Sequence, residues 1–314
     1  MSSESTDQES LLAGCEAGEP RRSPEPRHAV VLVEGPDAPD FLHRLCSQEV
    51  LEQEPGRASP AAFLDPKGKL VAISLIARAD NKVFVETPSE TAEALHELLD
   101  RYHFTEDLRI EKWAGFEGSA RRGVEVLGAG ASAVVGVEPG AARHGGDSLV
   151  VSTERNGVEA LRLYGAMADD ERVSAVPVSD QERVERLRIL SGLPTVGIDS
   201  EPTTLGLEAD LEDHVSTTKG CYTGQEIVAR IHTYGHVNRK LTRLLIAGEG
   251  EIEKDTPICT VEDGAPLGRV TSAIALPDGR GRLGLGYLPG PFLEEPEPIA
   301  VGAADGASVQ LLAR

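Results

Sequence analysis

Short apolar runs separated by turn signals begin at residue 28, and they predict a chain made mainly of strands with few helices. In the first part of the chain these runs predict five strands, at residues 29–33, 61–64, 70–77, 82–86 and 108–113. Helices are predicted where apolar positions recur every three or four residues, at residues 38–45 and behind a capping box at 87–90. Strands and helices in this order indicate an α+β domain of split β-α-β character.

The middle of the chain gives a weaker pattern, because residues 115–147 are rich in glycine, alanine and valine. Strands are predicted near residues 123–127, 149–152 and 160–164. The capping box Ser179-Asp180-Gln181-Glu182 then predicts a helix that ends near Gly192.

Alternation of apolar and polar positions dominates the last part of the chain and predicts a small closed β domain over 237–314. Residues 1–27 are rich in Ser, Glu, Pro and Gly and predict a disordered acidic tail. The region between them, 28–236, is expected to form two α+β subdomains, about 28–114 and 115–236.

Composition narrows the class of protein. The 314-residue chain has a net charge of −21 at pH 7, which argues against a surface for duplex nucleic acid. No apolar run approaches the ~18 residues that span a bilayer, and no secretory signal pattern begins the chain. The four cysteines lie far apart without a C-x-x-C pair, which argues against a disulfide framework and against a metal site. We therefore expect a protein of the reducing cytoplasm, with no membrane or nucleic-acid partner.

The candidate chemistry lies in the stretch Lys219-Gly220-Cys221-Tyr222-Thr223-Gly224-Gln225-Glu226. Thr223 and Glu226 have the spacing of a capping box, so a helix is expected to begin there. Cys221 would then lie close to the positive end of the helix, with Lys219 as a neighbouring cation, and both features favour a thiolate. The alternative is that Cys221 is an apolar residue of the core, as most intracellular cysteines are.

This stretch resembles the K-G-C-Y-x-G-Q-E signature of the YgfZ-type folate-binding proteins, a branch of the aminomethyltransferase (GcvT) superfamily linked to the maintenance of iron–sulfur proteins. Weaker similarities run through most of the chain, at residues 35–38, 63–69 and 268–273. The resemblance implies a GcvT/YgfZ-like α+β fold, with folate-binding domains around a central channel and a C-terminal β-barrel. It also implies a tetrahydrofolate cofactor, or a one-carbon derivative of it, and iron–sulfur client or assembly proteins as partners.

The resemblance implies roles for particular residues. Cys221 would be the catalytic thiol and Lys219 its activator. The folate-binding residues would be Asp65, Lys219, Tyr222, Gly224, Gln225, Glu226 and Arg230. Asp65 also has an ordinary interpretation, because it begins the turn Asp65-Pro66-Lys67-Gly68 and a carboxylate there usually bonds to the turn backbone.

One position departs from the pattern of the aminomethyltransferases. The glutamate that binds the pterin in those enzymes falls on Leu190, which accepts no hydrogen bond. The expected function is therefore tetrahydrofolate binding in support of iron–sulfur enzyme assembly or repair, through Cys221. An aminomethyltransferase and a non-catalytic, folate-responsive scaffold remain the alternatives.

Overall fold

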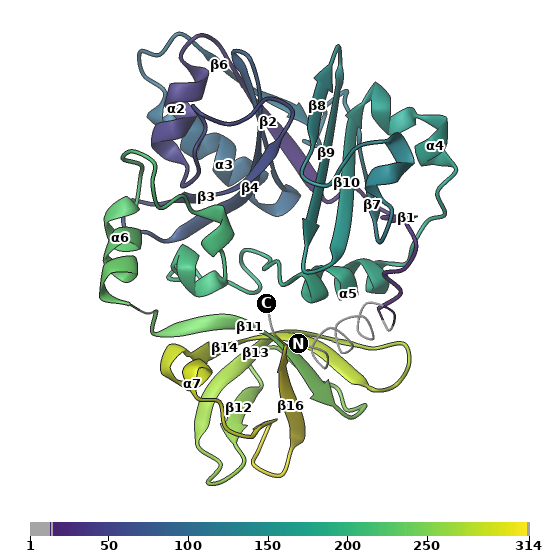
Figure 1. The fold of residues 1–314 in the computed structure, drawn as a ribbon, viewed down its shortest axis with the longest axis vertical. Helices are drawn as coiled ribbons and strands as arrows, with labels where there is room; N and C mark the ends of the chain where they lie inside the picture. The colour runs from purple at the N-terminus through teal and green to yellow at the C-terminus, as the bar shows by residue number, and fades with distance from the viewer. Residues whose placement is uncertain (1–12, 14, 236, 313–314) are drawn as a thin grey trace.

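The computed structural model describes residues 13, 15–235 and 237–312, and it has two antiparallel five-stranded sheets above a closed β-barrel (Figure 1). The first sheet has the order β3-β4-β5-β2-β6. Its strands are β2 (His28–Glu34), β3 (Ala58–Leu64), β4 (Leu70–Ala79), β5 (Lys82–Pro88) and β6 (Arg109–Ala114). Helices α2 (Ala38–Leu45) and α3 (Ser89–Tyr102) cover one face of this sheet through a shared core that includes Phe41, Leu95 and Leu99.

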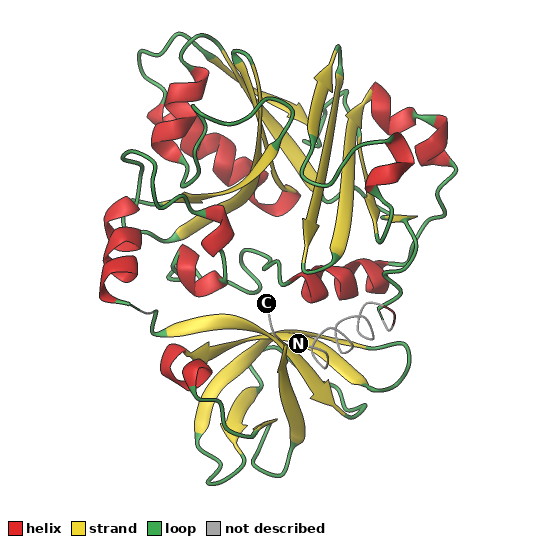
Figure 2. Cartoon of the chain, in the orientation of Figure 1, coloured by secondary structure: helices red, strands yellow, loops and turns green. Residues whose placement is uncertain are grey.

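The second sheet has the order β1-β7-β10-β9-β8 and packs face to face against the first. Its strands are β1 (Arg21–Arg22), β7 (Gly123–Leu127), β8 (Ala142–Gly145), β9 (Ser148–Arg155) and β10 (Val158–Gly165). The short helix α4 (Glu171–Ser174) lies on its outer side, and α5 (Gln181–Ser191) runs between the sheets and the barrel (Figure 2).

The barrel closes in the order β11-β14-β13-β12-β15-β16, so the predicted closed β domain is confirmed. Its strands are β11 (Arg239–Ala247), β12 (Pro257–Thr260), β13 (Pro266–Ala275), β14 (Gly281–Pro289), β15 (Ile299–Val301) and β16 (Ala307–Leu312), with α7 (Gly290–Glu294) after β14. Helix α6 (Gln225–Tyr234) comes just before the barrel and packs beside the first sheet (Figure 1).

The prediction of a disordered tail is wrong for residues 15–27. Strand β1 pairs with β7, and the Cys15 side chain is fully buried. The buried guanidinium of Arg183 donates to the carbonyl oxygens of Glu16 and Glu19, so this segment is fixed by its backbone as well as by the buried Cys15 and Ala17 side chains. Residues 1–12 and 14 of the predicted tail lie outside the described residues.

All three predicted capping boxes are wrong in detail, because each helix begins later than expected. Helix α3 follows Pro88, α5 follows Asp180, and α6 follows Gly224. The Asp180 carboxylate accepts a hydrogen bond from the Arg183 N–H, which makes Asp180 the cap in place of Ser179. At α6 the cap is a glycine in the left-handed conformation, with φ of 83°, and no side chain caps the helix.

Candidate functional site

The cysteine-containing stretch, residues 219–226, packs against the β3–β4 turn, residues 65–68. A β-carbon on Gly68 would approach the Ile227 β-carbon to 2.8 Å, and one on Gly224 would approach the Asp65 carbonyl oxygen to 2.7 Å. Only glycine permits two chains to lie so close with both backbones in the left-handed region. The structure therefore brings together two stretches that the sequence separates by about 150 residues.

Asp65 stabilises its own turn. Its Oδ1 accepts hydrogen bonds from the backbone N–H groups of Lys67, at 2.8 Å, and of Lys69, at 2.9 Å. The ordinary interpretation of Asp65 is thus confirmed, and its carboxylate helps to hold the surface on which Gly224 rests.

Lys219 does not have the position expected of an activator. The side chain is buried, and its ammonium donates to the carbonyl oxygens of His43 (2.5 Å), Cys46 (2.9 Å) and Gln48 (2.9 Å). These three bonds use all three donors of the ammonium and tie residue 219 to the end of α2. Burial lowers the pKa of Lys219. We therefore correct its role from activating the thiol to anchoring the turn that presents it.

Cys221 is exposed, whereas Cys15, Cys46 and Cys259 are buried. The interpretation of Cys221 as a residue of the core is thus wrong. The backbone around it is held from the side of α2, because the Thr223 N–H donates to the Arg44 carbonyl oxygen at 3.1 Å. A rigid turn thus presents this thiol at the surface.

His43 is a neighbour of this turn that the sequence did not suggest. Its Nε2 lies 3.7 Å from the position of a β-carbon on Gly220, and its Nδ1 is 3.1 Å from Oε1 of Glu49. Burial and the charge of Lys219 lower the pKa of His43, which keeps the ring neutral at pH 7. His43 is buried on α2, and its own carbonyl oxygen accepts from the Lys219 ammonium.

The other predicted residues of the stretch have mixed environments. Tyr222 is buried, its ring lies 5.0 Å from the Lys219 ammonium, and burial raises the pKa of its hydroxyl to about 12. Gln225 accepts a hydrogen bond from the Tyr222 N–H through its side chain, at 3.3 Å. Glu226 and Arg230 are exposed on α6.

A separate cavity of about 230 Å³ lies between the two sheets and above α5. Its walls are the inward-facing side chains of β4, β5, β7, β9 and β10, together with one side of α5 and the loop that follows it. None of the seven predicted folate-binding residues lines it. Their assignment to folate therefore stays a prediction, and the cavity offers a different set of residues.

Charged side chains form the polar end of this cavity. The buried Arg162 on β10 donates to Glu125 on β7 at 3.0 Å and to Glu86 on β5 at 3.1 Å, so it joins the two sheets. The Tyr164 hydroxyl also donates to Glu86, and burial raises the pKa of that carboxyl although Arg162 opposes the shift. His28 lines the same end. Sequence reasoning missed these residues, although charges at inward positions of otherwise apolar strands were a usable signal.

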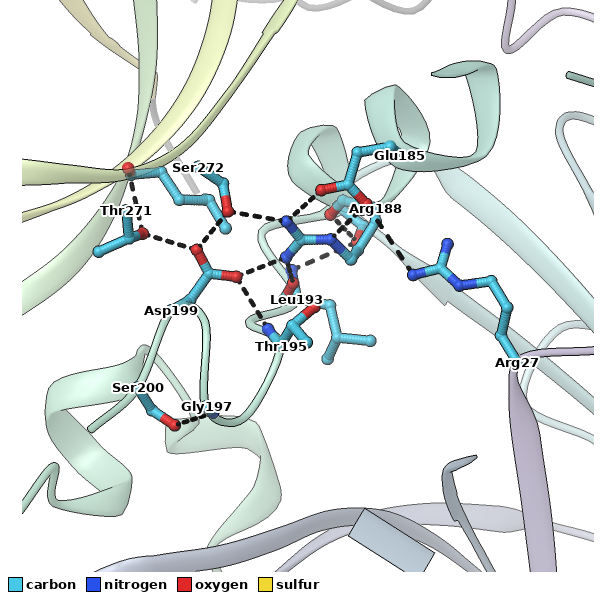
Figure 3. A network of polar contacts seen from close by, with 12 residues as sticks. Arg27, Glu185, Arg188, Leu193, Thr195, Gly197, Asp199, Ser200, Thr271 and Ser272 are labelled. Atoms are coloured by element: carbon cyan, nitrogen blue, oxygen red, sulfur yellow. Dashed lines mark hydrogen bonds and ion pairs between the residues drawn. The ribbon is translucent and has the colours of Figure 1, made fainter. Parts of the chain in front are cut away.

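The floor of the cavity is fixed by a network around Arg188 of α5 (Figure 3). Its guanidinium donates to Glu185, to Asp199, to the Leu193 carbonyl oxygen and to Ser272 of the barrel. Asp199 accepts in addition from Thr195, Thr271 and Ser272. This network locks α5, the loop after it and strand β13 together below the cavity.

Leu190 lies on the other side of α5. Its side chain is buried in the core that α5 shares with the barrel, and it does not line the cavity. The residue that replaces the expected glutamate therefore serves packing in this chain.

Two classes of feature are not found in the part of the chain that the structure describes. No group of three or more His, Cys, Asp or Glu side chains there is arranged to hold a metal ion. Within the same residues, no helix has the length and apolar character needed to cross a membrane.

Among known proteins, the chain is similar to iron–sulfur cluster assembly factors and to tRNA-modifying proteins. No family model matches it. It is 28% identical over 311 residues to the human mitochondrial iron–sulfur cluster assembly factor IBA57, a match that covers 90% of this chain and 81% of that protein. It is 25% identical over 276 residues to the tRNA-modifying protein YgfZ of Shigella boydii serotype 18, which covers 80% of each. A chloroplastic relative from Arabidopsis thaliana is 24% identical over 279 residues, which span 62% of its length and 82% of this chain.

A solved structure gives the fold. Aminomethyltransferase T of the glycine cleavage system from Bartonella henselae matches with a TM-score of 0.78 at 17% identity, over 97% of this chain and 88% of that one. The chain therefore has the aminomethyltransferase fold, and the resemblance to YgfZ-type proteins is confirmed along most of its length.

Proposed function

Because the chain has the aminomethyltransferase fold and is related along most of its length to IBA57 and YgfZ proteins, we propose that it supports the assembly or repair of iron–sulfur enzymes. In this proposal it binds a reduced folate and acts through the Cys221 thiol. The observation that carries the proposal is the exposure of this one cysteine on a turn fixed from three sides. All four cysteines are free, which fits a reducing compartment.

The cavity between the sheets fits the head group of a folate. Its volume of about 230 Å³ is near the lower end of small-molecule sites, ~300 Å³. Flat aliphatic walls from Leu75, Val158 and Ala160 suit a ring system, and the Nδ1 of His28 is a buried polar atom without a hydrogen-bond partner among the described residues. A bound reduced folate would supply a carrier for a one-carbon unit.

The thiol and the cavity are separate sites, since Cys221 is absent from the cavity lining. This separation favours a folate that stabilises or regulates the protein over one that reacts directly with Cys221. The thiol would instead meet a group that a partner protein carries. A lone cysteine does not hold a cluster by itself, so a partner must supply the other ligands.

The aminomethyltransferase alternative is less well supported, because Leu190 points into the barrel interface. An assay of aminomethyl transfer with the glycine-cleavage carrier protein tests it directly. The scaffold alternative keeps folate binding and the support of iron–sulfur enzymes. It differs from our proposal only in that it does not require the thiol.

The decisive experiment is complementation of cells that lack this protein, with the activity of an iron–sulfur enzyme such as aconitase as the readout. Cys221→Ser should fail to restore activity while its thermal unfolding and its affinity for a reduced folate remain those of the wild type. Cys259→Ser, a change at a buried cysteine of the barrel, is the matched control and should restore activity. Full activity with Cys221→Ser would favour the scaffold and reject the role of the thiol.

A further inference from the structure

Glu125 is the carboxylate of the cavity whose hydrogen bonds are incomplete. Its Oε1 accepts from Arg162 Nε at 3.0 Å, and among the described residues no donor reaches its Oε2. The side chain is nevertheless buried, with 6% of its area exposed. A buried carboxylate normally has donors to both oxygens, so this one has unused capacity next to a cavity.

The charges around Glu125 do not balance. A single guanidinium, Arg162, faces two carboxylates, Glu125 and Glu86. Both oxygens of Glu86 are used, one by Arg162 and the other by the Tyr164 hydroxyl. Glu125 is therefore the carboxylate of this pair with an oxygen left to accept a further hydrogen bond.

His28 does not supply the missing partner. Its Nδ1 lies 3.6 Å from Oε1 of Glu125, beyond hydrogen-bond length. Burial, together with the charges of Arg162 and Arg27, lowers the pKa of His28 well below its ordinary value, so the ring is neutral. Among the described residues, neither Oε2 of Glu125 nor Nδ1 of His28 has a hydrogen-bond partner, so the cavity ends in a carboxylate oxygen and a neutral imidazole nitrogen that are both open to a ligand.

The other cationic groups of the cavity have partners other than Glu125, and the Arg27 guanidinium lies 3.9 Å from a carboxylate oxygen of Glu185 in an ion pair. Arg188 uses its five donors within the network of its own helix and the barrel, and Arg155 is paired with Asp210 and Asp213. A ligand must therefore bring the donors that Glu125 lacks.

We propose that Glu125, with His28 beside it, recognises the donor edge of a planar heterocycle, in which an amino group and an adjacent ring N–H point the same way. The 2-amino-4-oxo pyrimidine edge of a reduced pterin has this arrangement. A flat ring is favoured over a compact ammonium ion because Leu127, Val158 and Ala160 line the cavity beside Glu125. The inference rests on the proposed folate binding for the class of ligand, and it adds the residues that select the head group.

The test is calorimetric binding of 5-formyltetrahydrofolate, of its analogue without the 2-amino group, and of p-aminobenzoylglutamate, which has no pterin. Glu125→Gln keeps an oxygen for Arg162 but replaces the free acceptor with an amide N–H₂. It should weaken binding of the intact folate by about 10- to 100-fold, the loss expected for a charge-assisted hydrogen bond. Glu171→Gln is the matched control, because it removes an equal charge from an exposed residue of α4 that does not line the cavity, and it should leave affinity unchanged.

The analogue without the amino group should bind wild type more weakly than the intact folate, and it should lose less affinity in Glu125→Gln than the intact folate does. The comparison of the intact folate with the analogue on wild-type protein does not need the variant, so it remains informative if Glu125→Gln does not fold. Equal affinity of wild type and Glu125→Gln for the intact folate would overturn the inference while folate binding stands. Failure of wild type to bind the intact folate would overturn both.

Discussion

Gly224 and Gly68 lie backbone against backbone, and a β-carbon on Gly224 would come within 3.3 Å of the Gly68 α-carbon. Both residues have positive φ, 83° and 75°. One is the cap of helix α6, and the other closes the turn between β3 and β4. The exposed thiol of Cys221 is thus presented on a surface whose shape depends on two residues without side chains.

Gly224→Ala should lower the free energy of unfolding by about 3 kcal/mol. The left-handed conformation costs an alanine roughly 1–2 kcal/mol, and the added methyl group meets the Asp65 carbonyl oxygen at 2.7 Å. Urea denaturation measures the change. Gly220→Ala is the matched control, because its β-carbon would have no contact closer than 3.7 Å, and it should change stability by less than about 0.5 kcal/mol. Equal effects of the two changes would show that the close approach has no role.

Lys219→Met should destabilise the protein by about 2–3 kcal/mol. The methionine fills a similar volume but leaves the carbonyl oxygens of His43, Cys46 and Gln48 without the ammonium they accept from. Lys67→Met, a change at an exposed lysine of the neighbouring turn, is the control and should be nearly neutral. If Lys219→Met unfolds at the same urea concentration as wild type, the lysine does not anchor the turn and its role as an activator must be reconsidered.

The sequence predicted the strands well, because each is a continuous or alternating apolar run bounded by glycine or proline. The helix predicted at residues 38–45 agrees with α2, Ala38–Leu45. The short strands β1, β8 and β15 were missed, since two, four and three residues give too little pattern. The capping boxes failed because neighbouring residues compete for the cap. Asp180 is as good a cap as Ser179, and Gly224 is held in place by contacts with the β3–β4 turn.

The residues of the candidate site also differ in how well the sequence could predict them. The local motif singled out Cys221 as a candidate thiol, but its exposure was one of two interpretations, because its turn is held by distant residues of α2 and of the β3–β4 turn. The cavity could not be predicted, because Glu125, Glu86 and Arg162 come from three strands in two sheets and meet only when the sheets pack. The role of Lys219 was misjudged for a related reason: its three acceptors lie in residues 43–48, far from it in sequence.

Asp199→Asn should lower the free energy of unfolding by about 3 kcal/mol, as is usual when one member of a buried ion pair is removed. The Asp199 side chain is fully buried and accepts from Arg188 and from hydroxyl groups of the barrel, so the variant weakens the junction between α5 and β13 (Figure 3). Thermal unfolding is the measurement. Asp169→Asn removes an equal charge from an exposed residue and should be neutral. A similar melting temperature for wild type and Asp199→Asn would mean that the barrel docks without this network.

A thiol reagent at pH 8 should modify a single cysteine of the folded protein rapidly. Cys221 is exposed, whereas burial raises the pKa of Cys15 to about 12, so only ~1 in 10⁴ of its thiols is ionised at pH 8. Burial also raises the pKa of Cys46, and Cys259 is buried on strand β12. Titration with Ellman's reagent should therefore count one thiol in native protein and four in guanidinium chloride, the number in the sequence.

Cys221→Ser supplies the control for this count, because it should remove the fast reaction and leave three thiols that react only on unfolding. Since the thiolate is the reacting species, the raised pKa of Cys15 and that of Cys46 should keep the modification of these two buried thiols slow in native protein. A second cysteine that reacts rapidly in native protein would contradict the assignment of a single accessible thiol. The proposed handover of a group from a partner would then have two candidate receivers.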